Sequence, residues 1–235
     1  MLSFICAQFL TVIAVVSPVW NEGWLSGFRN YFSNDQLSYA AIATNVSNGH
    51  LAFVEPFTQT NSLYYPSLWY QVLGLFSRIT GIPVYTAWNV LGTLMVCALI
   101  AGLGLIAFLL SRKLWAPIAP AIALFVGTFA TLTSDSWYTT LEHHAVLWSA
   151  FGTFFTLNAE AVGLCLNVVA LGLLAFTGFL GRQSARARLW LLAVTGALIG
   201  ITANIQTYNF FTGVAIVAAW GCSYSLITTR SKGLL

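Results

Sequence analysis

Side chains that can do acid–base or metal chemistry are few in this chain. The sequence holds 6 acidic residues and 3 histidines. A carboxylate can take a proton from a hydroxyl group or hold a divalent metal ion, and a histidine can serve both purposes near neutral pH. The candidates are Glu22, Asp35, Glu55, Asp135, Glu142 and Glu160, with His50, His143 and His144. The elements that carry them therefore decide what chemistry is possible.

The first candidate group lies in and after the stretch NDQLSYAAIATNVSNGH. Asp35 and Tyr39 are four residues apart, so on a helix they share a face. Glu55, beside Pro56, could assist Asp35 or bind a substrate hydroxyl group. Simpler alternatives remain open for all three: a helix cap for Asp35, an interfacial anchor for Tyr39 and a solvated loop acid for Glu55.

The second candidate group lies in the stretch SDSWYTTLEHHAVLW. Asp135 and Glu142 are seven residues apart, which is two helical turns, so one helix would present both on the same face. His143 and His144 are adjacent and point in different directions on a helix. The i, i+4 histidine spacing of helical metal sites is absent. A metal site here therefore competes with ordinary surface polarity.

The composition assigns these groups to a membrane protein. Of 235 residues, 58% are hydrophobic and 6% are charged, with a mean hydropathy of +0.81. Soluble domains carry roughly a quarter of their residues as charge. The net charge of +3 is small and its carriers are scattered, which argues against a nucleic-acid partner.

We expect an all-α integral membrane protein with one domain over residues 1–235. A helix needs about 20 apolar residues to cross a bilayer. About six transmembrane helices are predicted, at 3–20, 86–110, 115–133, 161–180, 189–205 and 209–228. The first could also be a secretory signal, but no basic residue precedes it, which favours a retained anchor.

The basic residues set the expected orientation. Seven of the nine fall on one side if the spans alternate: Arg112, Lys113, Arg182, Arg186, Arg188, Arg230 and Lys232. By the positive-inside rule this side is the cytoplasm. The chain is then a multi-pass plasma-membrane protein with both termini cytoplasmic, and its acids and histidines face the extracytoplasmic side.

Two interfacial helices are expected in the first outer loop, residues 21–85. The first, about 35–48, opens at Asn34 or Asp35 as a cap and ends at Gly49. The second, about 66–80, opens at Pro66 and ends at Gly81. Its expected apolar face comprises Leu68, Trp69, Val72, Leu73, Phe76 and Ile79, and its expected polar face comprises Ser67, Gln71, Gly74 and Arg78. The second outer loop covers residues 134–160.

This layout resembles the GT-C superfamily of membrane glycosyltransferases. The resemblance covers roughly residues 1–180. It rests on the single span followed by a long outer loop with an early acid at Asp35, and on YYPSLWYQVLGLFSRITGIPVYTAWNVLG, a surface helix leading into the second span. The closest types are bacterial cell-envelope arabinofuranosyl- and mannosyltransferases. Such enzymes usually have more spans, so the chain could be an N-terminal portion or a short relative.

The resemblance implies transfer of a sugar from a polyprenyl-phosphate carrier to an acceptor hydroxyl on a glycan or protein, outside the cell. Asp35 would act as general base or would hold a divalent metal such as Mg or Mn. Substrate contacts are expected from Tyr39, Glu55, Tyr65, Arg29 and Arg78, and the two arginines are the cations available to a lipid phosphate on that side. A second acid or metal ligand would come from Asp135, Glu142, His143 or His144.

Two other classes of function stay open. A transporter would use polar groups within the membrane, for which Asn167 and Asn204 leave room. A non-catalytic subunit of an envelope-biosynthesis complex would use its spans for packing and its outer loop to bind a membrane-protein partner. Small-residue stretches such as AVTGALIGITA suit close helix contacts in all three cases.

Overall fold

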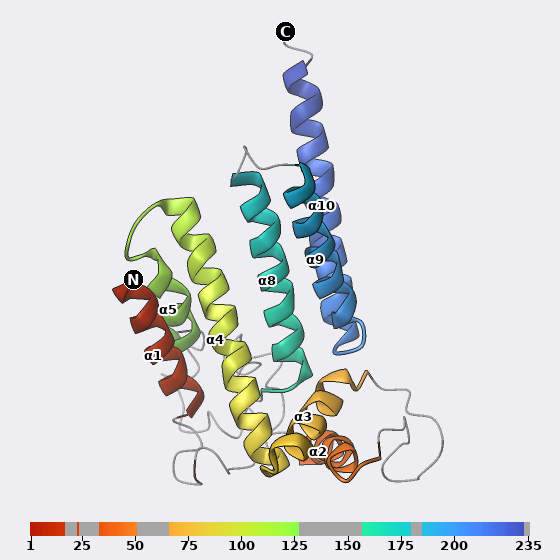
Figure 1. The fold of residues 1–235 in the computed structure, drawn as a ribbon. Coiled ribbons are helices and arrows are strands. Elements are labelled where there is room, and N and C mark those ends of the chain that lie inside the picture. The colour runs from red at the N-terminus through yellow and green to blue at the C-terminus, as the bar shows by residue number, and fades with distance from the viewer. Residues whose placement is uncertain (17–22, 24–32, 51–65, 127–156, 180–184, 233–235) are drawn as a thin grey trace.

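The computed structural model describes residues 1–16, 23, 33–50, 66–126, 157–179 and 185–232, and these are helical apart from short turns (Figure 1). No strand occurs in these ranges, so the expected all-α class is confirmed for them. The elements are α1 (Leu2–Val16), α2 (Ser33–Ser47), α3 (Leu68–Thr80), α4 (Val84–Ser111), a 3-10 turn (Ala116–Ile118), α5 (Ala119–Val126), α8 (Ala159–Phe179), α9 (Ala185–Thr202) and α10 (Thr207–Lys232).

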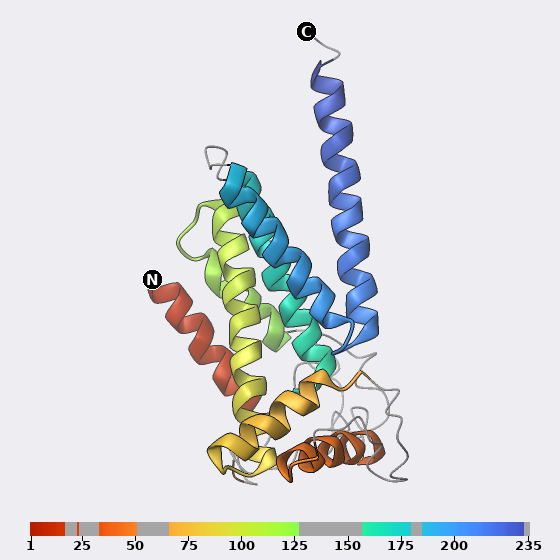
Figure 2. The ribbon, with the colours of Figure 1, turned by 45° about the vertical axis from the view of Figure 1, so that its right-hand side comes forward.

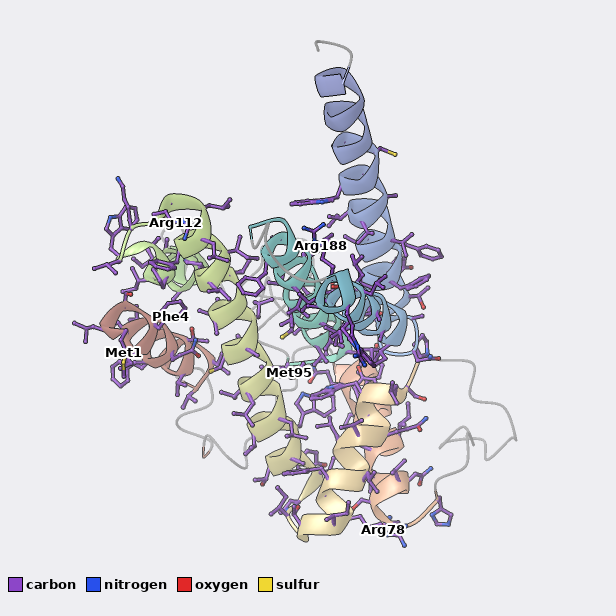
Figure 3. All side chains as sticks on the ribbon, turned by 45° about the horizontal axis from the view of Figure 1, so that its top comes forward. Met1, Phe4, Arg78, Met95, Arg112 and Arg188 are labelled. Atoms are coloured by element: carbon purple, nitrogen blue, oxygen red, sulfur yellow. The ribbon has the colours of Figure 1, made fainter. Side chains whose placement is uncertain are left out.

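The long helices α4, α8 and α9 lie side by side, and α10 contacts α8 and α9 near one end and leans away from them along the rest of its length (Figures 1 and 2). The helices α2 and α3 lie across this same end. We call this end the crossing end. The start of α4, the start of α8 and the turn between α9 and α10 all lie there. The opposite end carries Arg112, which follows α4, and Arg188 at the start of α9, whereas Arg78 lies at the crossing end (Figure 3).

Two of the described helices are long and apolar enough to cross a membrane. These are α4 and the segment Ala159–Phe176 of α8. Large apolar side chains remain exposed on several helices, among them Leu94, Leu105, Leu189, Trp190 and Phe211. Contiguous apolar surface of this kind is typical of sites that contact another protein or a membrane.

The contact between α4 and α8 is set by a glycine. A Cβ atom on Gly92 would lie 2.6 Å from the Cβ atom of Leu157, which immediately precedes the first turn of α8. Leu157 can pack this closely against the backbone of α4 only because residue 92 has no side chain. Next along the chain, Asn158 caps α8, since its Oδ1 accepts hydrogen bonds from the backbone N–H of Glu160 at 3.0 Å and of Ala161 at 3.3 Å. The start of α8 is thus fixed in position.

A second close contact joins α8 to α10, and we call it the asparagine clasp. Asn167 Nδ2 donates to the Asn209 carbonyl oxygen at 2.6 Å, and Asn209 Nδ2 donates to the Glu160 carbonyl oxygen at 2.9 Å. Each asparagine faces a glycine of the other helix: Asn209 lies against Gly163, and Asn167 lies against Gly213. The clasp holds the first turns of α10, and therefore the α9–α10 turn, against the start of α8.

The two helices between α1 and α4 differ in detail from the expectation. Because α2 begins at Ser33, Asn34 and Asp35 lie in its first turn rather than at its cap. Pro66 is not the first helical residue of α3, since Ser67 takes the N-cap position and the helix starts at Leu68. The expected ends are confirmed: Gly81 ends α3 in a left-handed conformation, φ 73°, and Gly49 follows α2 with φ 100°.

The buried face of α3 also differs from the expectation. Gly74 and Ser77 are buried, although Gly74 was assigned to the polar face. Val72, Leu75 and Ile79 are exposed. The reason is the neighbouring helix: a Cβ atom on Gly74 would collide with the carbonyl oxygen of Ala43 in α2. Close approach of two backbones requires the smallest residue at that point, so Gly74 turns inward and part of the apolar face turns outward.

Candidate functional site

The helices α2 and α3 pack in parallel, and this register determines which candidate residues lie together. The ring of Tyr39 stacks on that of Tyr70, with centroids 4.5 Å apart and planes 7° apart. Further along, Ala43 touches Gly74. At the far end, the Oγ atoms of Ser47 and its partner Ser77 are 3.1 Å apart. Each residue of α2 is therefore level with the residue of α3 about 30 positions later.

The N-terminal end of α3 is fixed to α8 and to the α9–α10 turn. The backbone N–H of Leu68 donates to the carbonyl oxygen of Asn204 at 3.0 Å. The hydroxyl group of Tyr70 accepts a hydrogen bond from the backbone N–H of Ala159 at 3.4 Å. Tyr70 is buried, and its ring also lies against that of Trp88 at the start of α4, at a centroid distance of 5.6 Å. Tyr70 thus links four helices.

Asp35 lies at this fixed end. It is in the first turn of α2, and the parallel register places that turn level with the start of α3. A carboxylate in the first turn of a helix is stabilised by the positive end of the helix dipole. The position of Asp35 follows from its backbone, because the structure does not describe its side chain. Tyr39, one turn later on α2, forms the aromatic stack described above.

Arg78 lies at the other end of the α2–α3 pair. It is in the last turn of α3, where its guanidinium group lies 3.2 Å from the point that a Cβ atom on Gly49 would occupy. Since Asp35 is level with residue 66, about twelve residues of helix separate the levels of the two side chains, which is about 18 Å. The structure therefore does not bring Arg78 and Asp35 together.

The other predicted site residues lie outside the described residues. These are Arg29, Glu55, Tyr65, Asp135, Glu142, His143 and His144. Within the ranges that the structure does describe, no three histidine, cysteine, aspartate or glutamate side chains are grouped so that they could hold a metal ion. The divalent metal that the resemblance implies stays a prediction, since Asp135, Glu142, His143 and His144 lie outside the described residues.

Two residues near Asp35 were not singled out from the sequence. Gln36, in the first turn of α2, is 1% exposed, and Trp69, in the first turn of α3, is 5% exposed. Among the described residues neither the amide of Gln36 nor the indole N–H of Trp69 has a hydrogen-bond partner. Buried polar atoms are normally paired, so these atoms are exceptional. The sequence carried no signal for them, since a glutamine and a tryptophan are ordinary residues of an amphipathic helix.

Comparison of the chain with protein-family models, with curated proteins and with solved structures found no match in any of the three. The functional argument therefore rests on the residues and their arrangement.

Proposed function

We propose that the chain is embedded in a membrane, with its long helices as spans and with α2 and α3 at the surface. The hydropathy of α4 and α8 supports this, as do the exposed apolar side chains on α9 and α10. The exposed residues Val72, Leu75 and Ile79 of α3 suit a helix that lies in the headgroup region. About six spans, as expected from the sequence, remain part of this proposal.

The proposed orientation has the crossing end outside the cell. Arg112, Lys113, Arg186 and Arg188 all lie at or beside helix ends opposite α2 and α3. Basic residues are retained on the cytoplasmic side of a membrane. With that end in the cytoplasm, Asp35, His50 and Glu160 belong to the extracytoplasmic half of the protein.

The function that this arrangement supports best is glycosyl transfer of the GT-C type. A sugar would move from a polyprenyl-phosphate carrier to an acceptor hydroxyl group at the outer face. Asp35 takes the hydroxyl proton as the acceptor oxygen bonds to the anomeric carbon of the sugar; the bond from that carbon to the phosphate oxygen breaks, and the lipid phosphate leaves. The observation that carries the proposal is the position of Asp35, at the start of a helix that packs against α3, whose own start is fixed to α8 and to the α9–α10 turn.

The mechanism requires Asp35 to be fixed relative to its substrates. General-base catalysis requires the base within hydrogen-bond distance of the proton that it removes, and misplacement of about 1 Å is costly. The Tyr39–Tyr70 stack, the Leu68–Asn204 hydrogen bond and the contact of Tyr70 with Ala159 together hold the start of α2 and α3. A surface helix with no such support would not hold a base in position.

The test is turnover by the purified protein in nanodiscs. Decaprenyl phosphate carrying arabinofuranose, mannose or glucose is supplied together with a hydroxyl acceptor, and released decaprenyl phosphate is measured. Asp35→Asn should lower the rate by roughly 10²- to 10⁴-fold, the usual contribution of a general base. Asn48→Ala, at the other end of α2, is the matched control and should retain the rate. Equal rates for Asp35→Asn and the unmodified protein would remove Asp35 from the mechanism.

Transport is a second candidate function, and one observation favours it. Asn167 lies within the candidate span of α8 and is 2% exposed, and among the described residues its Oδ1 atom has no hydrogen-bond partner. Buried polar groups at such a depth often mark a solute pathway. Uptake of sugars into proteoliposomes that Asn167→Leu abolishes and Asp35→Asn leaves unchanged would favour transport over transfer.

A further inference from the structure

The starting observation is the unpaired amide of Gln36. Among the described residues, both Nε2 and Oε1 lack a partner although the side chain is 1% exposed. A neighbouring glutamine shows the usual behaviour: Gln71 Nε2 donates to the Ser67 hydroxyl oxygen at 2.9 Å. Gln36 thus bears the cost of burial without the compensating bonds that proteins normally supply.

A second unpaired donor lies at the same level of the helix pair. The register that joins Tyr39 to Tyr70 places Gln36 level with Ser67, two residues before Trp69. The indole N–H of Trp69 is buried, and in the described part of the chain it has no acceptor. Both side chains belong to the first turns of parallel neighbouring helices, so they are at most about one helical turn apart along the pair. Asp35 immediately precedes Gln36.

The unpaired atoms specify the chemistry of a ligand. Gln36 offers a donor and an acceptor, and Trp69 offers a donor. A phosphate supplies acceptors alone, and would leave the amide oxygen of Gln36 facing negative charge. A hydroxyl group both donates and accepts, so a ring with neighbouring hydroxyl groups supplies both the donors and the acceptors that these atoms lack. Tyr39 and Tyr70 add apolar ring surface one turn away.

We propose that Gln36 and Trp69 bind hydroxyl groups of the sugar that is transferred, and so contribute to the choice of sugar. This proposal rests on the proposed function, because it places the sugar one residue from the base. Exposure of the two side chains to a substrate breaks no hydrogen bond of the Gln36 amide or of the Trp69 indole, since they have none within the described residues.

The test compares binding of two kinds of lipid by variants in a detergent without sugar groups, such as an amine oxide. The probes are decaprenyl phosphate alone and decaprenyl phosphate carrying arabinofuranose, mannose or glucose. Gln36→Met keeps the length of the side chain and removes the amide. We expect it to weaken binding of the preferred glycosylated probe by roughly 10- to 100-fold, and to leave binding of decaprenyl phosphate unchanged.

The melting temperature provides a second readout that a purely structural role would not reproduce. Gln36→Met should leave the melting temperature without ligand unchanged or raised, because an unpaired buried amide is removed. The matched control Gln71→Met removes a paired amide, and should lower the melting temperature while sugar binding is retained. If Gln36→Met does not fold, Trp69→Phe tests the same subsite, since it removes one N–H and retains an aromatic ring.

Each outcome bears on the proposal. Equal binding of glycosylated probes by Gln36→Met and the unmodified protein overturns the sugar subsite, while turnover that depends on Asp35 would still stand. Equal affinity of the unmodified protein for decaprenyl phosphate and for every glycosylated probe overturns it as well. Sugar binding that depends on Gln36, without any turnover, supports the subsite and contradicts the proposed transferase function.

Discussion

At the scale of single residues, two asparagines and two glycines determine how closely α8 and α10 approach. Asn167 occupies the space left by Gly213, and Asn209 occupies the space left by Gly163. The two asparagine side chains donate to carbonyl oxygens of α10 and α8 respectively. Hydrogen bonds between membrane helices contribute on average about 0.6 kcal/mol. Close packing around the glycines therefore matters at least as much as the hydrogen bonds.

We predict that Gly213→Ala destabilises the protein. The added Cβ atom would lie 2.6 Å from Asn167 Oδ1 and 3.1 Å from a methyl carbon of Ile199, so α10 must shift. Overpacking of this kind costs about 1–3 kcal/mol. The matched control is Gly221→Ala on the same helix, where in the described part of the chain no atom lies within 4 Å of the new Cβ atom.

The measurement is the melting temperature of both variants in the same detergent. We expect a lower melting temperature for Gly213→Ala. For Gly221→Ala we expect an unchanged or higher melting temperature, since alanine has a higher helix propensity than glycine. Equal melting temperatures for the two variants would mean that α8 and α10 do not meet through the clasp.

At the scale of elements, the pairing of α2 with α3 decides which residues form the candidate site. The parallel register places the first turn of α2 level with the first turn of α3, which is the one that contacts α8, and it separates Arg78 from Asp35. An antiparallel pairing would have placed Arg78 beside Asp35. The register is therefore the feature of the fold on which the site most depends.

We predict that Ser47→Cys and Ser77→Cys together form a disulfide on mild oxidation. Their Oγ atoms are 3.1 Å apart, so the Cβ atoms are near the separation that a disulfide needs. The background replaces the four free cysteines Cys6, Cys97, Cys165 and Cys222. The control pair, Ser47→Cys with Ser67→Cys, is close in the antiparallel register and far apart in the parallel one.

Crosslinking is detected by a protease site inserted within residues 51–65. Fragments that stay joined after cleavage, and separate on reduction, show the disulfide. The parallel register predicts this result for the 47–77 pair and not for the 47–67 pair. Joined fragments for the 47–67 pair alone would reverse the register and remove the site as described.

The helices themselves were predictable, because each follows from local patterns. Apolar runs near the length of a span and the glycines at 49 and 81 located α4, α8, α9 and α10 and the ends of α2 and α3 to within a few residues. The buried face of α3 was not predictable in the same way. Gly74 has no side chain to favour either face, and only the approach of Ala43 determines that it is buried.

The candidate site was predictable in part. Asp35 was singled out through the family resemblance and Tyr39 through its four-residue spacing from Asp35, and the roles of both stay predictions. Gln36 and Trp69 did not, because their significance lies in hydrogen bonds that they lack after folding. The asparagine clasp was not predicted either, because Asn167 and Asn209 are 42 residues apart in the chain and meet only after folding. The sequence does contain a pattern that points to the clasp: Gly163 comes four residues before Asn167, and Asn209 comes four residues before Gly213. Each helix therefore presents one glycine and one asparagine, one turn apart, in opposite order.

At the scale of the whole molecule, charge is distributed unevenly between the two ends. The described residues Arg112, Lys113, Arg186 and Arg188 belong to one end, and the candidate site belongs to the other (Figure 3). The proposed reaction uses a lipid-linked sugar outside the cell. It therefore requires the crossing end to face outward, and a reversed orientation would leave Asp35 with no such substrate.

The most direct measurement is labelling of single cysteines with a membrane-impermeant maleimide in intact cells. His50→Cys reports the crossing end and Arg112→Cys reports the opposite end, and both positions are exposed. Each is introduced into the cysteine-free background. We expect labelling of His50→Cys in intact cells, and labelling of Arg112→Cys only after the membrane is permeabilised. Labelling of Arg112→Cys in intact cells, with His50→Cys protected until permeabilisation, would contradict it.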